Sequence, residues 1–155
     1  MNWIHELQDV AKLVAAYMMA LPVGWQREKE AHSVGVRTIP VVAMASCGYV
    51  LLGTGMSHPS DAESRVIQGV AAGIGFVGAG AILKSENHVH GTATAASIWN
   101  IAAMGGAVAT EHFGVAAALA VLNFVALRYL APVKKLIDAG DSVQPASTAK
   151  HGPDD

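Results

Sequence analysis

Five long apolar stretches limit the folds open to this sequence more than any other feature. The last four contain one charged residue between them, Arg128, which lies close to an end. A helix that spans a bilayer needs about 20 largely apolar residues, with a range of about 17–25, and these four stretches meet that length. The first stretch is shorter and contains Lys12, whose side chain can reach towards the interface. The stretches are Val10–Trp25, Ile39–Gly55, Val66–Leu83, Thr92–Thr110 and Phe113–Ala131.

A soluble helical bundle is the alternative, and the patterning argues against it. Helices at a water-facing surface carry a polar stripe at the helical period, and Val66–Leu83 and Thr92–Thr110 have none. Charged residues make up 14% of the chain, against roughly 25% in soluble domains. We therefore expect an all-α, polytopic membrane protein with about five transmembrane helices. Residues 1–135 should form one transmembrane domain, and residues 136–155, which lack periodicity, a disordered cytoplasmic tail.

The charges between the stretches predict the topology. Lys and Arg collect in cytoplasmic loops. They occur in residues 26–38, at Lys84, and around the last stretch and tail, whereas residues 2–9 and the connection at Glu111 and His112 have none. This alternation predicts an N-terminus outside and a cytoplasmic C-terminus.

The third stretch contains the pattern GxGxxG, from Gly73 to Gly78. A dinucleotide site would need a strand before it and an acidic residue about 20 positions later, and the region around Ile98 has no acid. Small residues instead allow helices to pack closely in a membrane. We therefore predict that this helix is central to the bundle, with five helix-packing glycines: Gly69, Gly73, Gly75, Gly78 and Gly80.

Polar residues inside the fourth stretch are candidate functional residues. Such groups bond across helices or line a wet cavity. Ser and Thr can also bond carbonyls of their own helix, which is the interpretation favoured for Thr94 and Ser97. Asn100 is harder to satisfy locally, and both structural bonding and lining of a functional cavity stay open for it.

The densest charged region, residues 26–38, supplies the other candidates. It is either a solvated cytoplasmic loop, or Arg27, Glu28 and Arg37 fold back onto the bundle as paired charges. No acidic or thiol cluster completes a metal site with the histidines, and no catalytic triad or paired carboxylates appear in the spans. The sequence therefore predicts no enzyme activity, metal or cofactor, and a net charge of −2 predicts no nucleic-acid partner.

Several of these residues together resemble the MgtC/SapB family of bacterial inner-membrane proteins. The segment from Arg65 to Leu83 is similar to the family signature, and Gly91–Trp99 to its next block. The segments Gly24–Glu28 and Gly35–Thr38 are similar to its first cytoplasmic loop. The resemblance departs at Gln26, often Glu in the family, and at Thr92-Ala93, usually Leu-Thr.

The resemblance implies a five-helix inner-membrane domain, to which longer members add a soluble C-terminal domain. It also implies links to growth in low magnesium, to survival inside host cells, and to control of membrane potential or the membrane ATP synthase. The first hypothesis is a non-enzymatic regulator that binds membrane proteins, such as the ATP synthase membrane sector, small regulatory membrane peptides or a second copy of itself. The alternative is a small ion or solute transporter or channel with a polar path near Glu28, Arg37 and Asn100.

Overall fold

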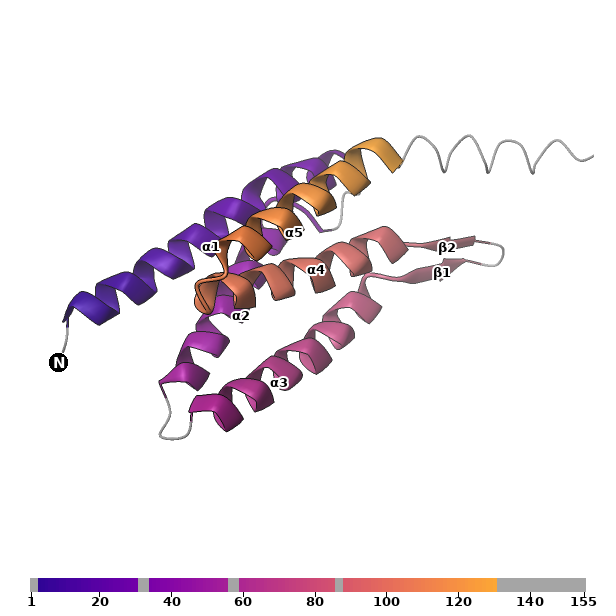
Figure 1. The fold of residues 1–155 in the computed structure, drawn as a ribbon. Helices are drawn as coiled ribbons and strands as arrows, with labels where there is room; N and C mark the ends of the chain where they lie inside the picture. The colour runs from indigo at the N-terminus through magenta and orange to yellow at the C-terminus, as the bar shows by residue number, and fades with distance from the viewer. Residues whose placement is uncertain (1–2, 31–33, 56–58, 86–87, 131–155) are drawn as a thin grey trace, which may run out of the picture.

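Five helices and one short hairpin make up the fold of the computed structural model, which describes residues 3–30, 34–55, 59–85 and 88–130 (Figure 1). The two strands pair antiparallel, with Lys84 opposite Val89. The predicted tail at 136–155 lies outside the described residues. In chain order the elements are α1 (Trp3–Glu30), α2 (Thr38–Thr54), α3 (Pro59–Gly80), β1 (Leu83–Ser85), β2 (His88–His90), α4 (Thr92–Ala109), α5 (Phe113–Val125) and η1 (Ala126–Leu130), a π-helical continuation of α5.

The helices follow the predicted apolar stretches but extend beyond two of them. Helix α1 begins before Val10 and runs through Pro22 to Glu30, so the expectation of a loop from residue 26 was wrong for residues 26–30. Proline is tolerated within membrane helices where neighbouring groups satisfy the freed carbonyl. Helix α3 likewise begins at Pro59, seven residues before the predicted stretch that starts at Val66. Its first turns carry Asp61, Glu63 and Arg65, which an apolar scan leaves out.

Helix α4 is the centre of the bundle, because it packs against α1, α2, α3 and α5 (Figure 1). It approaches α2 closely at Gly105, where an added Cβ would lie 3.0 Å from the carbonyl carbon of Ala43 and 3.1 Å from the Cβ of Ser46. Both distances are below the 3.5–4.0 Å that carbon atoms prefer. Glycine at this position therefore allows the two backbones to approach. The prediction that the third helix is central was wrong, since α3 lies at one side of the bundle.

The β1–β2 hairpin joins α3 to α4, where the sequence predicted only a loop. Gly91 follows the hairpin with a φ of 87°, which glycine adopts without strain. A Cβ at Gly91 would also collide with the carbonyl of Ala81. This glycine therefore sets the turn from which α4 begins.

Apolar side chains lie both inside and outside the bundle. The core contains Ile98, Ile101 and Met104 from α4, together with Ile39 of α2 and Val23 of α1. Large apolar side chains are also exposed on the outer surface, among them Phe76 at 84% and Leu122 at 64%. Isolated apolar residues at a water-facing surface are ordinary, but this density is typical of a surface that meets lipid or protein.

By length and composition alone, one helical segment within the described residues can cross a membrane, Phe113–Leu130. Helix α2 is apolar but shorter. Helices α1 and α3 carry charges in their first turns, and α4 contains Asn100, Ser97 and two threonines. The all-helical architecture is confirmed, with the hairpin as an addition, and the five-span topology stays a prediction.

Candidate functional site

The buried arginine of α1 forms the centre of the candidate site. Because α1 continues to Glu30, Arg27 lies on the helix and is only 6% exposed. Its guanidinium donates a hydrogen bond to the hydroxyl oxygen of Thr94, at the start of α4. Thr94 was expected to bond a carbonyl of its own helix, so this cross-helix partner is a correction. A buried cation is costly unless polar groups compensate it, and this contact ties α1 to the central helix.

Glu28 holds the chain between α1 and α2. Its carboxylate accepts a hydrogen bond from the backbone N–H of Val36 at 3.0 Å. Gly35 lies directly against Glu28, since an added Cβ would be 2.9 Å from the Glu28 Cα. The carbonyl of Gly35 accepts the N–H groups of Thr38 and Ile39 at 3.1 and 3.0 Å, which begins α2. Glu28 therefore fixes the geometry with which the chain enters α2.

Arg37 is the predicted partner of Glu28, but the structure does not bring the two charges together. Arg37 is exposed and immediately precedes α2. Among the described residues its guanidinium makes no ion pair, and the Glu28 carboxylate accepts a hydrogen bond from a backbone amide instead. Of the three charged candidates in residues 26–38, Arg27 and Glu28 bond to other parts of the chain. Arg37 does not pair with Glu28, so its role must be a different one.

Ser97 and Asn123 form a second polar contact between α4 and α5. The Ser97 hydroxyl oxygen lies 2.8 Å from the carbonyl of Ala93 and 3.1 Å from the Asn123 side-chain oxygen. A hydroxyl has one hydrogen to donate, so both contacts cannot be donations by Ser97. Exchanging the amide oxygen and nitrogen of Asn123 resolves this, because the amide then donates to Ser97 and Ser97 donates to Ala93. The own-helix bond predicted for Ser97 is confirmed, and Asn123 was missed.

Asn100 lies six residues along α4 from Thr94, somewhat less than two helical turns and about 9 Å away at the usual rise. It is half-buried, and its side-chain oxygen has no hydrogen-bond partner among the described residues. It does not line any of the three cavities described below. Thr94, Ser97 and Asn100 thus follow one another at three-residue intervals along the central helix. Thr94 bonds across to α1, and Ser97 bonds across to α5.

An ion pair joins α1 to the turn between α4 and α5, at the other end of the bundle. The ammonium of Lys12 lies 2.8 Å from the carboxylate of Glu111. Hydrogen bonding and charge attraction from Lys12 lower the pKa of Glu111 below its usual value. Glu111 has a φ of 63°, which residues other than glycine seldom adopt. The sequence predicted only that the Lys12 side chain would reach towards the membrane interface. The structure shows that Glu111 neutralises its charge.

The predicted packing glycines are mostly on the outside of the bundle. An added Cβ would meet nothing within 4 Å at Gly69, Gly73, Gly75 or Gly80, so their predicted packing role within the chain was wrong. Among these five glycines, an added Cβ would have a neighbour within 4 Å at Gly78 alone, where the Ala95 carbonyl oxygen would lie 3.5 Å away. Gly69 and Gly73 instead line a cavity between α3 and α2, and Gly75 and Gly78 line one between α3 and α4.

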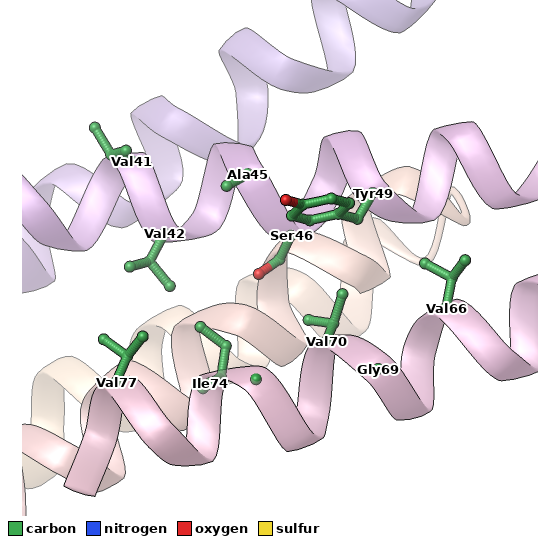
Figure 2. Close-up of a pocket in the computed structure, with 11 residues that line it drawn as sticks. Val41, Val42, Ala45, Ser46, Tyr49, Val66, Gly69, Val70, Ile74 and Val77 are labelled. Atoms are coloured by element: carbon green, nitrogen blue, oxygen red, sulfur yellow. The ribbon is translucent and has the colours of Figure 1, made fainter. Parts of the chain in front are cut away.

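Three apolar cavities border α3. The largest, of about 550 Å³, lies between α2 and α3 and includes Tyr49, Gly69 and Gly73 in its lining (Figure 2). Two others, of about 350 and 340 Å³, lie between α3 and α4, and Trp99 borders both. Within the described ranges no three His, Cys, Asp or Glu side chains come together as a metal site would need.

These features define a class of protein: a small helical bundle with an apolar outer surface and a few buried polar side chains that bond one helix to another. The family comparison then gives the assignment. The chain belongs to the MgtC family, whose model matches residues 13–136.

Individual relatives agree with this assignment. The chain is 36% identical to Protein SrpB of Synechococcus elongatus over 110 residues, which cover 63% of this chain and 60% of that protein. It is 32% identical to Protein MgtC of Brucella abortus over 136 residues, 86% of this chain and 57% of that protein. It is 31% identical to Protein MgtC of Salmonella typhimurium over 96 residues, 62% of this chain and 41% of that protein. The chain thus spans about three fifths or less of these curated relatives, and no solved structure matches it.

Proposed function

We propose that this chain is a multi-pass protein of the bacterial inner membrane that acts as a non-enzymatic regulator. Its five helices would span the bilayer with the N-terminus outside and the C-terminus in the cytoplasm. It would act by binding other membrane proteins through its helices.

One observation carries the proposal, namely that the apolar surface is on the outside while the polar side chains are bonded inside. Phe76 and Leu122 project from α3 and α5, where side chains of that kind meet lipid or another helix. Arg27 and Ser97 instead use their polar atoms to join helices. Such an arrangement favours a scaffold with a recognition surface over one that carries out chemistry.

The physiological setting is the one that the family motifs imply. The proposed regulator would serve growth in low magnesium, through membrane potential or through the activity of the membrane ATPase. Candidate partners are the membrane sector of the ATP synthase, small regulatory membrane peptides and a second copy of the chain. The ordered match to the family over most of the described chain supports this setting.

A transporter or channel is the second candidate, favoured by the polar levels of α4. Thr94, Ser97 and Asn100 follow one another into the bundle from the end where Arg27 is buried. Polar residues in a membrane helix often line a substrate path. The cavities argue the other way, since the side chains with polar atoms that line them are limited to Ser46, Tyr49, Trp99 and Thr110, none of them charged.

Photocrosslinking in native membranes tests the regulator. A photoreactive phenylalanine analogue at Phe76, which is exposed, should capture a membrane protein that mass spectrometry identifies. The same analogue at Phe124, which packs against the core, should not. If Phe76 captures lipid only, and purified protein in vesicles carries an ion flux that Asn100→Leu abolishes, the transporter is correct and the regulator is not.

A further inference from the structure

The groove between α2 and α3 is the feature that the proposed function leaves unused. It opens outwards, because the Tyr49 side chain, Gly69 and Gly73 in its lining are all exposed. In Figure 2, Val41 and Val77 lie at one end of the groove, and Tyr49 lies towards Val66 at the other. An added Cβ at Gly69 or Gly73 would meet nothing within 4 Å, so the α3 side of the groove is open space.

The length of the groove matches one leaflet of a bilayer. Along α2 it extends from Val41 to Tyr49, and along α3 from Val66 to Val77. At about 1.5 Å per residue these segments measure roughly 12 and 16 Å. A leaflet contributes about half of a hydrocarbon core of about 30 Å. A spanning helix of a partner would need a groove about twice as long, whereas one acyl chain would not.

A positively charged side chain, Arg37, lies beyond the Val41 end of the groove. Arg37, Val41, Ala45 and Tyr49 are spaced by four residues, which places them along one side of a helix. The last three line the groove, and Arg37 has the backbone angles of a helix, so the register extends to it. Arg37 is exposed, and it makes no ion pair with another described residue. The groove is therefore apolar along its length and positively charged at its entrance.

We infer that the α2–α3 groove binds one acyl chain of an anionic phospholipid, whose headgroup phosphate lies at Arg37. Apolar lining excludes the headgroup from the groove itself, and the guanidinium is well suited to a phosphate. The inference rests on the proposed membrane placement and is independent of the regulatory role. It also gives the exposed glycines of α3 a use, since they leave room for the chain.

The test uses a photoactivatable lipid. The full chain is placed in phosphatidylcholine vesicles that contain either phosphatidylglycerol or phosphatidylcholine with a diazirine in the middle of an acyl chain. Labelled peptides are mapped by mass spectrometry. Labelling around Val41 and Val77 should be stronger with the phosphatidylglycerol probe. Labelling around Leu122, an exposed residue of α5, should be equal for the two probes and shows that the protein is embedded.

Two variants and matched controls make the test specific. Gly73→Leu should fill the groove and remove most of its labelling, while Gly80→Leu, on the same helix with equally open space, should not. Arg37→Gln should lower the preference for phosphatidylglycerol by about fivefold, roughly the effect of one basic residue at an anionic surface. Lys84→Gln, an exposed cation of β1, should leave it unchanged.

Two results would overturn the inference. One is groove labelling that is no stronger than labelling around Leu122 and is indifferent to both variants. The other is a photoreactive residue at Val77 that captures a second copy of the chain, or another protein, in native membranes. Absence of labelling around Leu122 as well would instead contradict the membrane placement itself, so the two failures are distinguishable.

Discussion

Replacing Gly105 with alanine should force α2 and α4 apart, because the added Cβ has no space. The carbonyl carbon of Ala43 and the Cβ of Ser46 would lie 3.0 and 3.1 Å away, so the helices must separate by roughly 0.5–1 Å to restore ordinary contact. Overpacking of this kind typically costs about 1–3 kcal/mol. At roughly 2–4 °C per kcal/mol for a chain of this size, the melting temperature should fall by about 2–12 °C.

The neighbouring glycine provides the control. A Cβ at Gly106 would lie 3.7 Å from a methyl group of Val50, which is an ordinary contact. Gly106→Ala changes helix propensity in the same way, so the difference between the two variants isolates the collision. Both proteins are heated in detergent, and the fraction that remains monodisperse is measured by size-exclusion chromatography. Equal melting temperatures for the two variants would refute the close approach of α2 and α4.

Two further predictions concern the charged residues. Glu28→Ala should lower the free energy of unfolding by about 1 kcal/mol, because it removes the acceptor of the Val36 amide. Since Arg37 makes no ion pair with Glu28, the losses of Glu28→Ala and Arg37→Gln in stability or complementation should add. A double mutant that departs from additivity would restore the predicted pair. The lowered pKa of Glu111 means that its pair with Lys12 stabilises the fold above about pH 4.5, and that this stabilisation is lost as the pH falls through the lowered pKa. Lys12→Gln should remove this part of the acid sensitivity when melting is measured as a function of pH. An unchanged acid profile in that variant would contradict the role of the pair.

Hydropathy alone located the helices, because a buried or lipid-facing helix must satisfy its own backbone and exclude charge. It placed α2, α4, and α5 together with η1, within a few residues of their observed bounds. It failed at the ends of α1 and α3, where charged residues such as Arg27 and Glu63 continue the helix. Charge marks the end of an apolar stretch, but it does not mark the end of a helix.

The packing could not be predicted from the same signal. In a membrane helix the side chains that face lipid are as apolar as those of the core, so the pattern does not tell which face is inside. The glycines of α3 therefore indicated a central helix, whereas it is Gly105 of α4 that lets the central helix approach α2 closely. A polar residue carries more information, since it must find a partner. Asn123, a polar residue in the middle of the apolar fifth stretch, could have been singled out on that ground.

The resemblance named the family from motifs, and the family comparison confirmed it. Part of the candidate site followed, since Arg27 and Thr94 were both expected to matter and they contact each other. That contact joins residues 27 and 94, which no local pattern relates. Only the arrangement of α1 against α4 brings them together.

The topology of the chain is the most direct test of the account, since the regulator, its partners and the lipid groove all require helices that cross the membrane. Alkaline phosphatase, which is active only outside the cytoplasm, is fused at Ser60, at Glu86 and after Asp155. The alternation of basic residues predicts an active fusion at Ser60 and inactive fusions at Glu86 and after Asp155. Activity at Glu86 or after Asp155, or inactivity at all three positions, would contradict the five-span arrangement.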